Sequence, residues 1–98
     1  MSKDRELLEL AAKAAGINTK GFPESTEDWK WQPLRSSGFA FTLMVQLGLE
    51  VRVDYEGMNF TIAYSDNDNF KEHHGSDPYA ATRRAIVRAA AEIGKEMP

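Results

Sequence analysis

Hydrophobic and polar positions follow a helical period at both ends of the chain. Apolar residues from Leu7 to Ala15 recur at helical spacing with charged residues between them, which predicts an amphipathic helix over 3–15. Near the other end, Asp77 is followed directly by Pro78. Asp accepts hydrogen bonds from the free N–H groups of a first helical turn, and Pro suits that turn, so the pair predicts a helix over 78–95.

The middle of the chain changes to a period of two. Apolar and polar residues alternate over 49–55 and 58–64 around Glu56-Gly57, which predicts a β-hairpin with a two-residue turn. In this register Val53 would face Phe60, and all the large apolar side chains of both strands would share one face. Residues 65–77 are polar and rich in turn formers, so they are expected to form a loop.

Residues 38–47 fit two interpretations. As a strand, Phe39, Phe41 and Leu43 alternate with smaller or polar residues. As a helix, Ser37 would cap the start and Gly48 would end the last turn. The period by itself slightly favours the strand.

The connection over 18–37 contains Gly, Pro and several hydroxyl residues, together with large apolar side chains. Trp29 and Trp31 are spaced to share one face of an extended segment. One interpretation is a long loop held on the core by two tryptophans. The other is an aromatic surface for a ligand or partner.

Composition narrows the classes of function. The chain has 98 residues, no cysteine, and 12 basic against 15 acidic residues for a net charge of −3. The missing cysteines exclude disulfides, thiol nucleophiles and cysteine-bound zinc, and the negative charge argues against a protein that coats nucleic acid. The charged start has no apolar segment typical of a signal peptide, so a cytoplasmic location is expected.

Three groups of residues are candidates for a site. Residues 50–77 contain seven acids and two basic residues, which predicts an acidic contact for a partner. Its residues are Asp54, Glu56, Asp66 and Asp68. Trp29 and Trp31 form an alternative surface for the partner. Arg83, Arg84 and Arg88 are an alternative phosphate contact, although Arg83 falls near the apolar arc of its helix and is expected to pair with an acid of 24–28 or of the hairpin. His73 and His74 lie near several acids, but their spacing does not fit a metal site, and neither a cofactor nor a metal is expected.

Two blocks resemble the phage ABA-sandwich domain family of tailed phages and prophages. The first is Trp31-Gln32-Pro33-Leu34 with Ser36-Ser37-Gly38-Phe39-Ala40-Phe41-Thr42-Leu43 and Leu47-Gly48-Leu49, and the second is the closing segment 77–90. The family's acidic helical stretch after Pro-Leu is here apolar. The resemblance implies that 38–47 is a helix and that the protein acts in the host bacterial cytoplasm. The family has no assigned activity, so it implies no catalytic residue.

These observations predict a single α+β domain over 1–98, with a small antiparallel sheet covered by helices near 3–15, 38–47 and 78–95. Because a two-stranded sheet is marginal, a third strand is expected from 29–32 or from a second copy in a homodimer. The predicted function is a non-catalytic phage accessory protein that binds and modulates a host or phage macromolecule, inhibition of a host defence system being one version. Binding of a nucleotide or nucleic acid through the last helix is the alternative, and no membrane contact is expected.

Overall fold

The computed structural model of the protein describes residues 3–54, 59–66 and 68–98. Three α-helices, a short 3-10 helix and three strands follow one another along this part of the chain, so the predicted α+β class is confirmed. In chain order they are α1 (Lys3–Ala14), η1 (Thr26–Asp28), α2 (Ser37–Leu47), β1 (Glu50–Asp54), β2 (Phe60–Tyr64), β3 (Asn69–His73) and α3 (Pro78–Glu96).

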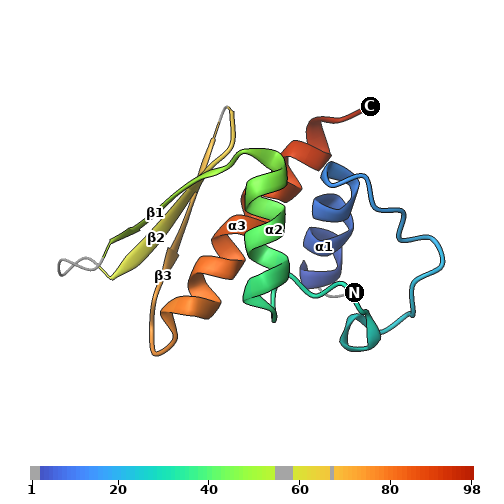
Figure 1. Ribbon diagram of the computed structural model, residues 1–98, viewed down its shortest axis with the longest axis horizontal. Coiled ribbons are helices and arrows are strands. Elements are labelled where there is room, and N and C mark those ends of the chain that lie inside the picture. Colours follow the sequence, from blue (N-terminus) through green and yellow to red (C-terminus); the bar gives the residue numbers. More distant parts are fainter. Residues whose placement is uncertain (1–2, 55–58, 67) are drawn as a thin grey trace.

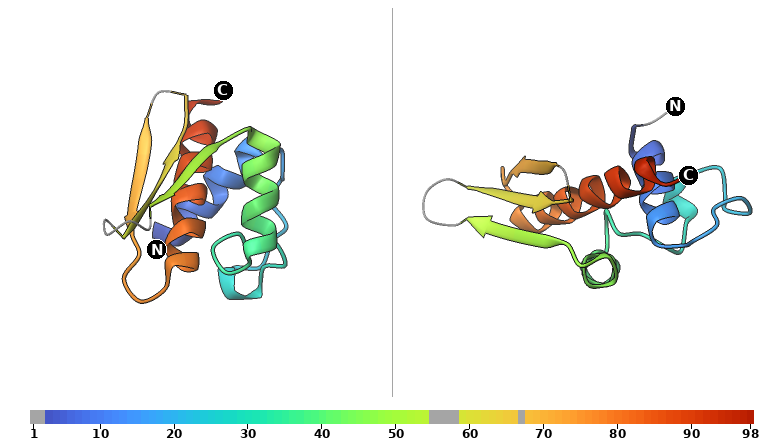
Figure 2. Two further views of the ribbon diagram at one scale, coloured as in Figure 1. Left: turned by 60° about the vertical axis from the view of Figure 1, so that its left-hand side comes forward. Right: turned by 90° about the horizontal axis from the view of Figure 1, so that it is seen from above.

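Helix α3 is the centre of the fold. The strands form one antiparallel sheet in the order β1-β2-β3, and β2 and β3 lie against one side of α3. Helices α1 and α2 pack on the other sides of α3, as Figure 1 and both views of Figure 2 show. Asp77 caps α3 as predicted, because its Oδ1 accepts hydrogen bonds from the N–H groups of Tyr79 and Ala80.

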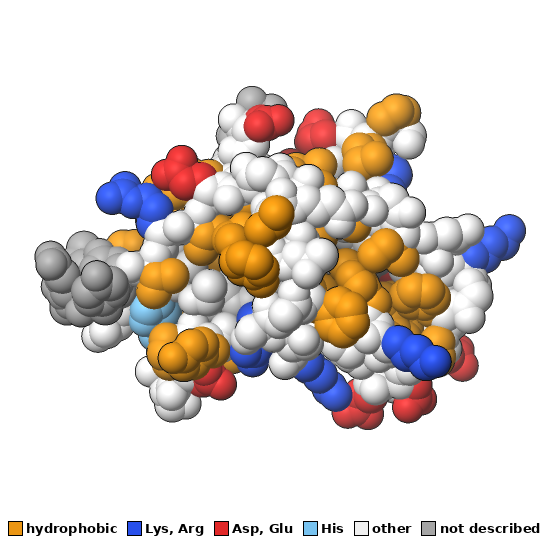
Figure 3. Space-filling view, in the orientation of Figure 1, with side chains coloured by type: hydrophobic (Ala, Val, Ile, Leu, Met, Phe, Trp, Pro, Cys, Tyr) orange, Lys and Arg blue, Asp and Glu red, His pale blue; other side chains and the backbone are white. Residues whose placement is uncertain are grey.

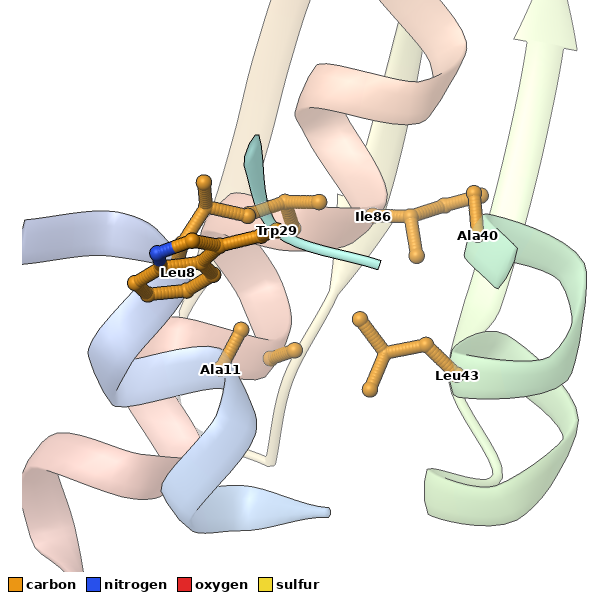
Figure 4. Close-up of a cluster of buried hydrophobic side chains, with 8 residues drawn as sticks. Leu8, Ala11, Trp29, Ala40, Leu43 and Ile86 are labelled. Atoms are coloured by element: carbon orange, nitrogen blue, oxygen red, sulfur yellow. The ribbon is translucent and has the colours of Figure 1, made fainter. Parts of the chain in front are cut away.

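The main core lies where the three helices meet. Together with Trp29 the cluster contains Leu8 and Ala11 of α1, Ala40 and Leu43 of α2, and Ile86, Val87 and Ala90 of α3, and Figure 4 shows it with Trp29 beside Leu8. Alanines dominate the faces that α1 and α3 turn toward each other, so the two backbones come close together. At Gly94 the approach leaves no room for a side chain, since a Cβ there would lie 1.9 Å from the carbonyl oxygen of Leu10.

The predicted register of the hairpin is wrong by one residue. Val53 pairs with Thr61 instead of Phe60, and Val51 pairs with Ala63 instead of Ile62. The faces of β2 are therefore exchanged: Thr61 and Ala63 point toward α3 and are fully buried, while Phe60, Ile62 and Tyr64 lie on the opposite, outer face. The predicted turn at Glu56-Gly57 lies outside the described residues.

The reason for this register lies in α3. The helix presents Ala85 and Ala89 to the sheet, and both are fully buried against Ala63. At such a close approach only small side chains of β2 fit, so Phe60 or Ile62 in these positions would overlap the helix. Val51 and Phe70 of the neighbouring strands fill the space at the sides.

The third strand comes from a segment that was expected to be a loop. Residues 69–73 form β3 and pair with β2, so neither 29–32 nor a second copy supplies this strand. Phe70 is the one apolar residue of this segment, so the sequence shows no alternation that would predict a strand. The segment is a strand because it pairs with β2.

Residues 38–47 are helical, as the family resemblance implied. The cap is Ser36, one residue before the predicted Ser37, and its Oγ accepts a hydrogen bond from the N–H of Phe39. Gly48 ends the helix with a φ of 65°, as expected for a left-handed cap. Within the described residues, no helix is both long and apolar enough to cross a membrane.

Candidate binding groove

A groove of about 740 Å³ opens between α2, β1 and the first turns of α3. Its walls are α2 and β1, which diverge from the short connection that joins them, and α3 forms its floor (Figure 1). The residues that line it are Ser37, Ala40, Phe41, Met44, Val51, Val53, Asn59, His74, Pro78, Tyr79, Thr82, Arg83 and Ile86. We call this the α2–β1 groove.

Large apolar side chains in and beside the α2–β1 groove are open to solvent. Phe41 and Val45 on α2 are each 61% exposed, Val53 on β1 is 45% exposed, and Tyr79 on α3 is 73% exposed. Hydrophobic side chains accordingly gather around α2 on the face seen in Figure 3. Such an uncovered apolar region on a small protein is typical of an interaction site.

The main chain of β1 adds hydrogen-bonding groups to this wall. β1 is an edge strand: among the described residues it pairs with β2 alone, so the N–H and C=O groups on its other side are available beside the groove that Val51 and Val53 line. The opposite edge, at β3, is partly covered because Arg88 donates a hydrogen bond to the carbonyl oxygen of Lys71 at 3.1 Å. The two edges of the sheet are therefore not equivalent.

A chain of hydroxyl groups lies at the floor. The hydroxyl of Thr82 donates to the carbonyl oxygen of Pro78 at 2.8 Å, so toward Thr61 it acts as the acceptor, at 2.9 Å. The single proton of Thr61 is then used, and Thr61 accepts from Nε2–H of His74 at 2.9 Å. This order assigns the neutral His74 to the Nε2–H form and leaves its Nδ1 as an acceptor.

Arg83 supplies the positive charge of the α2–β1 groove. Its Nε donates to the carbonyl oxygen of Leu34 at 3.0 Å, and its Nη1 donates to the hydroxyl of Ser37 at 3.1 Å. The ion pair expected with an acid of 24–28 or of the hairpin is not found among the described residues, where two neutral oxygen atoms accept these hydrogen bonds instead. Among the described lining residues Arg83 is the one with a full charge at pH 7, and none of them is acidic.

The other two arginines of α3 are held by acids of neighbouring elements. Nη2 of Arg84 lies 2.8 Å from a carboxylate oxygen of Asp4, and Nη1 of Arg88 lies 2.6 Å from one of Glu72. Arg84 therefore lies between α3 and α1, and Arg88 lies between α3 and β3, each beside a carboxylate. A phosphate at this place would have to displace two existing carboxylates, so the structure does not bring the three arginines together as a phosphate site.

The predicted acidic contact is divided between two ends of the sheet. Asp54 is the last residue of β1, whereas Asp66 and Asp68 follow the far end of β2 and are exposed. Five residues of extended chain separate these ends, which is roughly 14 Å. Glu56 and the side chain of Asp54 lie outside the described part of the structure. In the described part of the chain, Asp54 is therefore separated from Asp66 and Asp68 by the length of the strand.

The tryptophans belong to the core more than to the surface. Trp29 is 3% exposed, its Nε1–H donates to the carbonyl oxygen of Pro23 at 2.7 Å, and Phe22 packs edge-on against its ring. Trp31 is partly buried and packs against the same cluster. The interpretation of a loop held by its tryptophans is confirmed, and Trp29 is corrected from a partner contact to a core residue.

The histidines lie beside a smaller hollow of about 380 Å³. Its nearby acids already have partners, since Asp4 pairs with Arg84 and Asp77 caps α3. Among the described residues no group of three or more His, Asp or Glu is placed to hold a metal ion.

Sequence reasoning missed Phe41, Val53 and Tyr79 as site residues. Tyr79 lies in the first turn of α3 and is left 73% exposed there. One signal was present: α2 carries no charged residue over its 11 positions, yet only Ala40 and Leu43 are buried. A helix with apolar side chains on every side is typically buried on every side, whereas this fold leaves most of the α2 surface exposed.

Comparison of the chain with protein-family models, curated proteins and solved structures gives no match.

Proposed function

We propose that this protein is a non-catalytic binding protein that holds an extended segment of a protein partner in the α2–β1 groove. The observation that carries the proposal is the position of a free sheet edge beside exposed apolar side chains. A segment that pairs with β1 would form a fourth strand, and its alternate side chains would enter the groove against Phe41 and Val53.

An extended segment fits this place better than a helix. A helix uses its own main-chain groups internally, so it would leave the edge of β1 unpaired, whereas a strand satisfies this edge and covers the floor at the same time. At the partly covered edge of β3, an added strand would have to displace Arg88 from the carbonyl oxygen of Lys71, which favours addition at β1. The partner we propose, a host or phage protein, follows from the family resemblance alone.

Two matched variants test the groove. Phe41 and Val45 lie one turn apart on α2 and are equally exposed at 61%, but only Phe41 lines the groove. We expect Phe41→Ser to abolish recovery of a stoichiometric partner from nuclease-treated bacterial lysate, and Val45→Ser to retain it. Thermal unfolding of both variants checks that neither change disturbs the fold.

Amide hydrogen exchange of the recovered complex then tests the mode of binding. Strand addition predicts that partner binding slows the exchange of residues 50–54. A partner that Phe41→Ser still recovers, or that leaves exchange over 50–54 unchanged, contradicts the proposal. Loss of the partner only in an Asp66→Asn, Asp68→Asn double variant would instead support the acidic contact that the sequence predicted.

A further inference from the structure

We infer that the segment bound beside β1 carries an acidic side chain that pairs with Arg83, so that the α2–β1 groove selects apolar strands with one carboxylate. This inference rests on the proposed function and specifies its ligand. It starts from the charges of the groove: Arg83 is the one fully charged residue among the described lining residues, and no carboxylate accompanies it.

The guanidinium of Arg83 is held in place but not neutralised. Two of its nitrogen atoms are anchored by neutral oxygen atoms of Leu34 and Ser37. By contrast, Arg84 and Arg88 each contact a carboxylate at less than 3 Å. An anchored arginine loses little side-chain entropy when it binds, so a carboxylate placed against it gains from a preorganised, partly desolvated charge.

The shape of the groove favours a carboxylate on a side chain over one at a chain terminus. α2 and β1 converge where Gly48 and Leu49 connect them, and they are furthest apart at Ser37 and the end of β1 (Figure 1). Arg83 contacts Ser37 and so lies at this wide end. Because a bound chain has room to continue past this open end, the inference places an internal residue, and not the terminus, beside Arg83.

A second copy of this chain is a poorer occupant. Pairing β1 with β1 of another copy over all five residues would set Arg52 opposite Arg52, and like charges directly opposite each other are destabilising. Among its described lining residues the groove also offers no acidic residue that would complement Arg83 of a second copy.

The test uses a display library of random decapeptides and then synthetic peptides. We expect the selected peptides to alternate apolar residues around one Asp or Glu, and replacement of that acid by its amide to weaken binding to the wild-type protein about tenfold. In Arg83→Gln the acid and amide peptides should bind within a factor of two of each other. Lys95→Gln removes the same charge at an exposed position at the end of α3 and should keep the tenfold preference.

The possible results separate the inference from the proposed function. If peptides bind in the groove without an acid, or if Arg83→Gln keeps the preference for the acid, the inference is wrong and the function stands. Peptides that need a free C-terminal carboxylate also contradict it, as the acid and amide forms of the terminus will show. If Phe41→Ser weakens the binding of none of the selected peptides, or if the protein proves to be a dimer through this groove, both the inference and the proposed function are wrong. Arg83→Lys keeps the charge and should retain part of the preference, which separates a loss of charge from a disturbed fold.

Discussion

Gly94 offers the strictest test of the packing between α1 and α3. Replacement by alanine normally stabilises a helix by about 1 kcal/mol, because glycine has the greater conformational entropy to lose. Here the added Cβ would lie 1.9 Å from the carbonyl oxygen and 2.8 Å from the carbonyl carbon of Leu10. These are backbone atoms of a helix, so they cannot move aside as the end of a side chain can.

The size of the effect follows from the shift that this contact requires. The two helices must separate by roughly 1 Å, and a gap of that size removes a quarter to a half of the dispersion energy of each contact along the seam. That seam includes Ala11, Ala12, Ala90 and Ala91, all of which are buried. Overpacking of this kind costs up to about 3 kcal/mol, so Gly94→Ala should lose about 2 kcal/mol after the gain in helix propensity.

Thermal and urea unfolding followed by circular dichroism measure this change. A loss of about 2 kcal/mol corresponds to a fall in Tm of roughly 8–16 °C for a domain of this size. The matched control is Gly38→Ala in α2, where the new Cβ would meet only the Ser36 hydroxyl at 3.6 Å, an ordinary contact. We expect this control to be neutral or more stable by up to about 1 kcal/mol. A Gly94→Ala protein as stable as the wild type would refute the close approach of the two helices.

Two further changes test the floor of the groove and the start of α3. Thr61→Val keeps the volume but removes the buried hydroxyl between His74 and Thr82, so the free energy of unfolding should fall by about 1–2 kcal/mol in urea titrations; an unchanged midpoint would contradict the hydroxyl chain. Asp77→Ala removes the cap from two N–H groups of α3 and should cost about 1 kcal/mol by the same measurement, whereas Asp77→Asn should retain most of the stability.

The candidate site was less accessible to sequence reasoning than the helices. Charge density suggested an acidic surface, but charges that are close in sequence lie at opposite ends of a strand once β2 is extended. The arginines of α3 were a candidate phosphate contact, but α1 supplies Asp4 as the partner of Arg84 and β3 supplies Glu72 as the partner of Arg88. The α2–β1 groove could not be located, because its walls become neighbours only after α2 packs on α3.

The sequence by itself determined the local elements, where neighbouring residues carry the information. The helical period near the start, the Asp77-Pro78 cap and the left-handed Gly48 depend on side chains within one or two turns, and all three are confirmed. Over 38–47 the spacing of apolar residues slightly favoured a strand, whereas the family resemblance implied the helix that the structure has. These features need no knowledge of the rest of the chain.

Tertiary structure alone decided the register of the hairpin and the existence of β3. Alternation in β2 places large side chains on one face and small ones on the other, and it does not say which face is buried. Ala85 and Ala89 bring α3 so close to the sheet that only Thr61 and Ala63 fit, so contact with a distant helix overrides the usual preference for burying the larger side chains. A strand as polar as β3 likewise forms because an edge of β2 needs partners for its main chain.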